Sequence, residues 1–271
     1  MSPRVARALI LLVVPCVAVV GLGRAEASPR QADAREAGSG HAGPGAARSA
    51  AYGGPAGRHP RTEITPAFGR VMPLKNQSRI VRTVWGYRYV SGQQNSRLTI
   101  SPSRGGLLYR DTGTQRWRDL PAACRKRAVS TGIAAWCRIP EAFQGRTRMF
   151  LEVWPRLGAD RVDGSRLTSK YRLWVLADKG RDRVLGGAGA DFVNGAQGLD
   201  RIWGGGGNDW LRGGKADDQV HGGAGADQLL GMEQSDVIDG GPGADAIYCG
   251  PGADKAFTDA ADRVRLCERV S

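Results

Sequence analysis

An apolar residue occupies every ninth position from residue 184 to residue 256, and glycine or polar residues fill most positions between. The nine apolar residues are Val184, Val193, Ile202, Leu211, Val220, Leu229, Ile238, Ile247 and Ala256. Each nine-residue unit can therefore bury one such side chain. A repeat this short and strict predicts a solenoid, in which every unit adds one inward-facing residue to a shared core.

An aspartate lies two positions before each of these apolar residues. In most units the aspartate is the last residue of a glycine-rich stretch of six. The nine aspartates are Asp182, Asp191, Asp200, Asp209, Asp218, Asp227, Asp236, Asp245 and Asp254. The full unit reads GGxGxDxUx, where U is the apolar residue, and residues 186–194 are a complete example. Glycine at the first, second and fourth positions permits positive φ and close backbone approach, which turns main-chain carbonyl groups inward.

This pattern resembles the RTX family, the hemolysin-type calcium-binding nonapeptide repeat, over about residues 177–257. The resemblance implies a right-handed parallel β-roll in which six residues turn, three form a strand, and two units complete one coil. It also implies several Ca²⁺ ions between neighbouring loops, held by the nine aspartates and by loop main chain. The loop glycines concerned are Gly186, Gly187, Gly189, Gly204, Gly205, Gly207, Gly222, Gly223, Gly225, Gly240, Gly241 and Gly243.

Elementary electrostatics leads to the same ion. Neighbouring rungs of a parallel sheet lie about 4.8 Å apart, so stacked carboxylates would repel by roughly 3 kcal/mol per pair at an effective dielectric near 20. A cation between them removes this repulsion. Oxygen ligands on flexible loops, with no cysteine or histidine among them, favour calcium over magnesium or transition metals. The alternative is an array of Asp-Gly turns without metal.

Since two units complete a coil, alternate loops lie on opposite edges of the roll. The regular edge carries the loops that end in Asp191, Asp209, Asp227 and Asp245. The irregular edge carries the loops that end in Asp182, Asp200, Asp218, Asp236 and Asp254, where Ala216, Met232 and Gln234 replace glycines. A side chain raises the cost of left-handed backbone geometry. We therefore expect the tightest calcium sites on the regular edge, and weak or empty ones beside Asp218 and Asp236.

The first 27 residues have the features of an export signal. Arg4 and Arg7 precede an apolar stretch at residues 8–23, and an A-x-A cleavage pattern follows at residues 25–27. The stretch is shorter than the roughly 20 residues of a transmembrane helix. A retained membrane anchor and lipidation of Cys16 are the alternatives. We predict a signal peptide at 1–27, no transmembrane span in the mature chain, and a location outside the cell or on its surface.

Composition divides the rest of the chain. Residues 28–64 are mostly Ala, Gly, Pro, Arg and Ser, which predicts a disordered linker. Residues 65–157 hold short alternating runs separated by turn sequences, which predicts a small basic antiparallel β domain. The calcium-binding roll follows at 158–257, regular from 177, and a C-terminal cap at 258–271. The predicted fold class is all-β, a right-handed parallel β-roll preceded by that small domain.

Four cysteines lie beyond the signal, and in an exported chain they imply disulfides. Three pairings are open, of which Cys124 with Cys137 and Cys249 with Cys267 are the simplest. The first pair would close a hairpin, and the second would tie the tail to the last rung of the roll. Zinc is the alternative use, but no CxxC motif or nearby histidine accompanies these cysteines.

Aromatic residues and positive charge suggest surfaces for partners. Trp174, Phe192 and Trp210 recur at 18-residue spacing and should stack as an aromatic ladder, which suits docking of the β domain, the interpretation we favour, or binding of sugar rings. The net charge of +13 is concentrated before the repeats and suits an anionic cell-wall polymer or polysaccharide. The alternative is a solvated arginine-rich surface. No nucleic-acid-binding motif is present, so no specific nucleic acid is expected.

The sequence contains no HExxH, GxSxG or P-loop motif, and its histidines (His41, His59, His221) lie in the linker and at an outward repeat position. We predict a non-enzymatic, secreted calcium-binding repeat protein whose roll folds around calcium and has a structural or adhesive role. The alternative is an exported hydrolase whose site lies in residues 65–157, with the roll as a calcium-dependent accessory.

Overall fold

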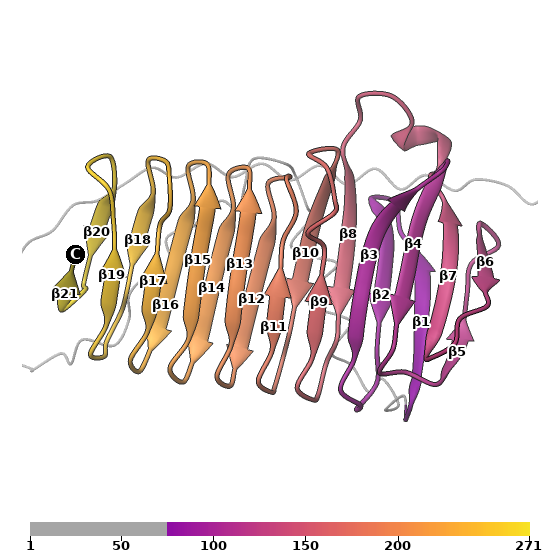
Figure 1. Ribbon diagram of the computed structural model, residues 1–271, viewed down its shortest axis with the longest axis horizontal. Helices are drawn as coiled ribbons and strands as arrows, with labels where there is room; N and C mark the ends of the chain where they lie inside the picture. Colours follow the sequence, from indigo (N-terminus) through magenta and orange to yellow (C-terminus); the bar gives the residue numbers. More distant parts are fainter. Residues whose placement is uncertain (1–74) are drawn as a thin grey trace, which may run out of the picture. The chain divides into compact units, whose positions relative to one another are not determined.

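The computed structural model describes residues 75–271, in which nearly all regular structure is β-strand. The predicted signal peptide (1–27), the linker (28–64) and the first residues of the expected β domain lie outside this range. The strands form two sheets of ten and eleven strands, and those of the solenoid lie side by side along its axis (Figure 1). One short 3₁₀-helix, η3 (Glu141–Phe143), interrupts them.

Sheet 1 contains β1 (Gln77–Arg82), β2 (Gly86–Val90), β5 (Arg116–Asp119), β8 (Met149–Trp154), β10 (Tyr171–Leu176), β12 (Phe192–Gln197), β14 (Trp210–Lys215), β16 (Gln228–Glu233), β18 (Ala246–Tyr248) and β20 (Arg263–Arg265). Sheet 2 contains β3 (Arg97–Ser103), β4 (Gly106–Asp111), β6 (Cys124–Arg127), β7 (Ile133–Arg138), β9 (Arg161–Asp163), β11 (Arg183–Leu185), β13 (Arg201–Gly206), β15 (Gln219–Ala224), β17 (Val237–Asp239), β19 (Lys255–Phe257) and β21 (Arg269–Val270).

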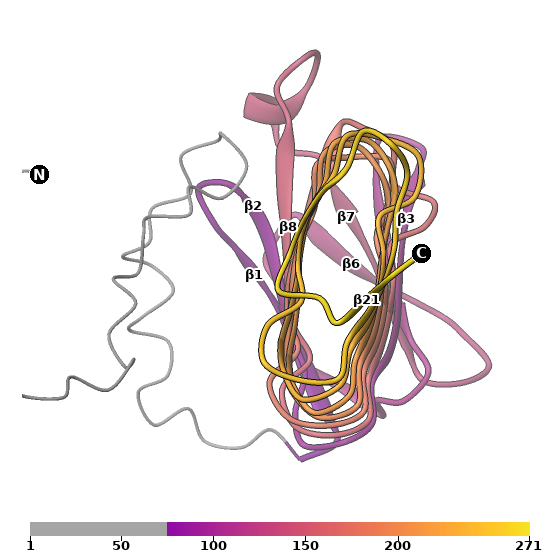
Figure 2. The same cartoon turned by 90° about the vertical axis from the view of Figure 1, so that its left-hand side faces the viewer.

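From β8 onward the chain alternates between the two sheets, and each strand pairs in parallel with the strand one coil later. Val184 lies opposite Ile202, and Val193 lies opposite Leu211, so one coil takes 18 residues. Two nonapeptides therefore make one coil, as predicted. The coils stack as a β-solenoid of about seven turns. Viewed along the stack, they superimpose as a flattened oval (Figure 2).

The apolar column forms the core of the solenoid. All nine of its residues, from Val184 to Ala256, are at most 2% exposed. Each nonapeptide supplies one of these side chains, so each strand of the repeats contributes one residue of this column to the core between the sheets. Hydrophobic burial per residue is therefore small for a chain of this length.

The central strands are longer than the three residues expected. Strands β12 to β16 have six residues each, whereas β11, β17, β18 and β19 have three. The extra residues come from the loops: Gly205 pairs with Gly223, and Ala196 pairs with Gly214, in the parallel ladder. The first loop residues of the middle coils thus continue the strand register before the chain turns.

The strands before the repeats continue the same two sheets. Strands β3, β4, β7 and β6 pair antiparallel, as do β1 and β2, while β1 and β5 are parallel. Strand β2 then pairs in parallel with β8, and β3 with β9. The junction therefore contains main-chain pairing between the strands of the two segments. Strand β8 lies within the range expected for the β domain, yet it is already part of the parallel stack.

Both predicted disulfides are present. Cys124 and Cys137 face each other across the β6–β7 hairpin. Cys249, directly after β18, is bonded to Cys267 in the tail. Strands β20 and β21 add one further strand to each sheet, so the tail covers the last repeat. Within residues 75–271, no helix is long and apolar enough to cross a membrane.

Candidate metal-binding loops

The repeat aspartates form two buried columns, one along each edge of the solenoid. None of the nine is more than 2% exposed. The main-chain N–H of Asp209 donates to Oδ1 of Asp227 at 2.8 Å, and the same bond links each aspartate to the one 18 residues later. One oxygen of each carboxylate therefore holds neighbouring coils in register.

The other carboxylate oxygen has no such partner. Oδ2 is buried without a hydrogen-bond donor in Asp182, Asp200, Asp209, Asp218, Asp227, Asp236, Asp245 and Asp254. The exception is Asp191, whose Oδ2 accepts the N–H of Gly187 at 2.7 Å. A buried carboxylate oxygen without a donor is costly unless a cation neutralises it.

Main-chain carbonyl oxygens lie beside these carboxylate oxygens. A Cβ atom on Gly204 would stand 2.2 Å from Oδ2 of Asp209 and 2.5 Å from the carbonyl oxygen of Gly222, one coil later. Gly222 is placed in the same way between Asp227 and Gly240. Gly204 and Gly222, which hold the first position of their loops, therefore have no room for a side chain, because oxygens from two successive coils converge over the Cα.

This donor set fits calcium. Carboxylate and carbonyl oxygens on adjacent loops are the hard ligands that calcium takes, and calcium tolerates irregular geometry. No three His, Cys, Asp or Glu side chains converge within residues 75–271, so a centre built from side chains alone is not found in this part of the chain. A site here needs the glycine carbonyl groups as well.

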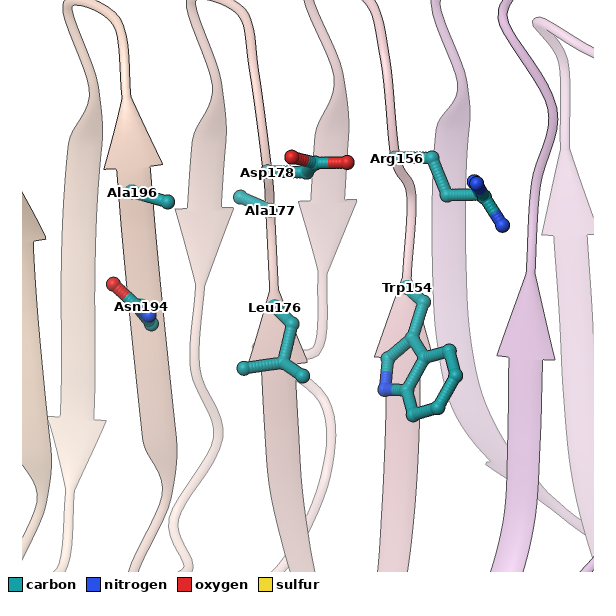
Figure 3. Close-up of a pocket in the computed structure, with 7 residues that line it drawn as sticks. All are labelled: Trp154, Arg156, Leu176, Ala177, Asp178, Asn194 and Ala196. Carbon is teal, nitrogen blue, oxygen red and sulfur yellow. The ribbon is translucent and has the colours of Figure 1, made fainter. Parts of the chain in front are cut away.

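The two edges differ in backbone strain. Ala216, Met232 and Gln234 adopt φ values of +85°, +96° and +77°. Arg156, Asp178 and Ala196 do the same at earlier loops of the irregular edge, where they follow one another on neighbouring coils beside a shallow pocket of about 130 Å³ (Figure 3). Each such residue costs about 1–2 kcal/mol relative to a right-handed conformation. The aspartate hydrogen bonds are alike on both edges, so unequal calcium affinity stays a prediction.

Three further carboxylates complete the columns. The N–H of Asp160 donates to Oδ1 of Asp182 at 2.7 Å, so Asp160 begins the irregular edge. At the other end, the N–H groups of Asp245 and Asp254 donate to Asp262 and Glu268 at 2.9 and 2.8 Å. The half-repeat at residues 158–163 signals Asp160 in the sequence. Asp262 and Glu268 lie 17 and 14 residues after their partners and are therefore out of period.

Burial raises the pKa values of all nine repeat aspartates above the ordinary value of 3.8, and in seven of them the rise is large. Desolvation is the main cause, hydrogen bonds from main-chain N–H groups oppose it, and neighbouring carboxylates add to it in most cases. The pKa reaches about 8 for Asp209 and Asp218, about 7 for Asp182, Asp191 and Asp236, and about 6 for Asp200 and Asp227.

These raised pKa values predict that protons compete with calcium. The calcium-free fold binds protons that the unfolded chain has already released, so its stability falls as pH rises from about 4 through 8. Calcium must displace those protons, and its affinity should fall about tenfold per pH unit between pH 8 and 6 for each proton released per ion. Calorimetric titrations in buffers of different ionisation enthalpy would measure the proton release. A calcium affinity that is constant over this range would contradict the assignment.

The three ladder residues lie on the outer face of sheet 1. Trp174, Phe192 and Trp210 occupy the same register on β10, β12 and β14. The Trp174 and Phe192 rings are stacked with centroids 4.2 Å apart, and the Phe192 and Trp210 centroids lie 4.6 Å apart. Phe192 is buried between its neighbours. A role for the ladder in docking or in sugar binding stays a prediction.

Comparisons with known proteins agree with the loop chemistry. The comparison with curated proteins found no match, and neither did the comparison with solved structures. A family model described as the RTX calcium-binding nonapeptide repeat matches residues 174–202, 196–229 and 221–256. The matched segments cover the coils that carry both aspartate columns. Residues 174–256 of this chain therefore contain RTX calcium-binding nonapeptide repeats.

Proposed function

We propose that the protein is a secreted calcium-binding repeat protein whose solenoid folds around several Ca²⁺ ions and has a structural or adhesive role outside the cell. The observation that supports it best is the set of buried Oδ2 atoms without donors, of which those of Asp200, Asp209 and Asp227 lie beside a glycine carbonyl oxygen of the next coil. Two columns of such groups need cations, and the oxygen-only donor set favours calcium.

The proposed ligands are the nine repeat aspartates together with main-chain carbonyl groups of the loop glycines. Calcium, when bound, neutralises the stacked carboxylates and joins consecutive coils. The protein's own contribution is to hold the oxygens in place: Oδ1 is fixed by a main-chain N–H, which orients Oδ2 toward the carbonyl oxygen of the next coil. Asp160, Asp262 and Glu268 extend the same arrangement to the two ends.

Secretion would expose the loops to a higher calcium concentration than the cytosol provides. Extracellular calcium modules commonly bind with dissociation constants of about 0.1–1 mM. Such a site stays free of calcium in the cytosol and fills outside the cell, so the chain would wind after export. The disulfides Cys124–Cys137 and Cys249–Cys267 suit an oxidising compartment. We propose residues 65–157 and the tail 258–271 as the two ends that close the solenoid.

Expression of the full chain with its own N-terminal segment tests the proposal. We expect mature protein in the medium or on the cell surface, with an N-terminus close to residue 28 and no free thiol. Mass spectrometry of the intact protein, with and without reductant, measures both. Full-length protein retained in the cytosol with reduced cysteines would show that the proposed location is wrong.

A further inference from the structure

The outer face of sheet 2 carries a column of four arginines that no repeat pattern requires. Arg97 on β3 lies opposite Arg161 on β9, Arg161 opposite Arg183 on β11, and Arg183 opposite Arg201 on β13. All four side chains are exposed. Neighbouring strands are about 4.8 Å apart, so one guanidinium group follows another at each rung. We call these four residues the arginine column.

Within residues 75–271, few groups neutralise this column. Arg161 has an ion pair at 3.6 Å with Asp163 on its own strand, which is a weak surface interaction. Arg183 lies over the Trp203 ring at 4.7 Å. Within residues 75–271, Arg97 and Arg201 form no ion pair. Like charges at adjacent positions of a sheet destabilise it, so a ligand with regularly spaced negative charges would relieve the repulsion.

The surface is hollowed and more basic at the start of the column. Two adjoining hollows of about 340 and 310 Å³ lie over β3, β4 and β9. Their charged lining residues are Arg97, Arg110, Arg161, Arg166 and Asp163. Four arginines therefore surround one carboxylate there, and the column leads away from these hollows along the solenoid.

The faces of the neighbouring aromatic ring are occupied, which favours a ligand bound through its charge over one that stacks on the ring. The guanidinium group of Arg183 lies over the Trp203 ring, and His221 stacks on that ring with centroids 5.3 Å apart and planes 4° apart. Both groups compete for the faces on which an unstacked base would lie, and proteins that bind single-stranded nucleic acid need such faces. What the surface offers is four exposed arginines in register on neighbouring strands, and guanidinium groups pair well with carboxylates.

We propose that the arginine column binds a linear acidic polysaccharide, and that calcium controls this binding by winding β9, β11 and β13 into register. An extended polysaccharide with a carboxylate at regular intervals presents charge as the column does, along one straight line. The inference rests on the proposed calcium-dependent folding, since an unwound chain has no column. It gives the adhesive role a specific surface and a class of ligand.

The test compares two variants of the mature full chain that lose the same charge. R161Q/R183Q/R201Q removes three members of the column, whereas R125Q/K126Q/R127Q removes three exposed charges from β6, an edge strand of the same sheet that carries no member of the column. Binding to immobilised hyaluronan is measured in 2 mM calcium, with neutral dextran and a 20-base-pair DNA duplex as other probes. We expect the column variant to bind hyaluronan at least tenfold more weakly and the β6 variant to stay within twofold, with binding weakened by salt.

An equal loss of hyaluronan binding in both variants would mean that net charge alone causes the effect, and it would overturn the proposal. Unchanged binding by the column variant would overturn it as well. Duplex DNA that binds as tightly as hyaluronan, with the same dependence on the column, would overturn the choice of ligand. Circular dichroism of each sample distinguishes a failure to bind hyaluronan from a failure to fold with calcium. A protein that folds with calcium but does not bind hyaluronan refutes this inference alone. A protein that is folded and binds hyaluronan equally well in EGTA refutes the calcium control and the proposed folding together.

Discussion

Removal of calcium with excess EGTA at pH 8 is expected to abolish most of the parallel β structure from β10 to β19. Each nonapeptide of this segment buries one apolar side chain, and each coil stacks two buried carboxylates against those of the next coil. Without calcium, the carboxylates must either repel or bind protons, and at pH 8 few of them can remain protonated. Metal binding is therefore coupled to folding.

Hydrogen exchange resolved by peptide is the measurement that locates this loss. Amides of β12, β14 and β16 should lose most of their protection in EGTA and regain it when calcium, but not magnesium, is added. The β6–β7 hairpin should change less, because a disulfide joins its strands and it contains no repeat aspartate. The expectation would be contradicted if, in EGTA, only the N-terminal strands lost protection from exchange while the amides of the repeats kept theirs.

Replacing Gly204 by alanine is expected to raise the calcium concentration at the folding midpoint by at least tenfold, while Gly206→Ala leaves it within about twofold. Both glycines lie on β13, and neither has a positive φ, so alanine fits the backbone at both. The added methyl group at Gly204 would meet Oδ2 of Asp209 at 2.2 Å and the Gly222 carbonyl oxygen at 2.5 Å. At Gly206 it would meet nothing closer than 3.9 Å.

The Gly204 and Gly206 variants form a matched pair, because both replace glycine by alanine on the same strand. The change in intrinsic conformational propensity is therefore the same. Calcium titrations followed by circular dichroism would compare their midpoints with that of the unmodified protein. Equal shifts in the two variants would mean that the oxygens above Gly204 are not a calcium site, and that alanine acts on the strand alone.

The periodic part of the fold could be predicted because one spacing carries most of the information. The nine-residue spacing of the aspartates and the apolar column predicted a solenoid, and the resemblance to the RTX repeat implied two nonapeptides per coil, which the strand pairing confirmed. The glycines mark where the loops approach one another. Four cysteines left three disulfide pairings open, and the simplest of these, between local pairs, was confirmed. The six-residue length of the central strands could not be predicted, because glycine-rich loop residues have low strand propensity and join the ladder only through their neighbours.

Features that depend on register between distant segments were missed. Main-chain pairing of β2 with β8 and of β3 with β9 joins stretches with no common sequence pattern. Asp262 and Glu268 end the columns out of period, because the tail has its own turns and a disulfide. The arginine column was hidden for a similar reason: an insertion between β9 and β10 separates Arg161 from Arg183 by more than one regular coil.

We propose that calcium lies between the stacked loops and holds the coils together. Native mass spectrometry of the purified protein, after calcium loading and again after EGTA, counts bound ions and reports compactness in the same spectrum. We expect several calcium ions on a compact chain, and we expect EGTA to remove them and to shift the protein to extended, highly charged species. A chain that stays compact after EGTA with no ion bound would contradict it.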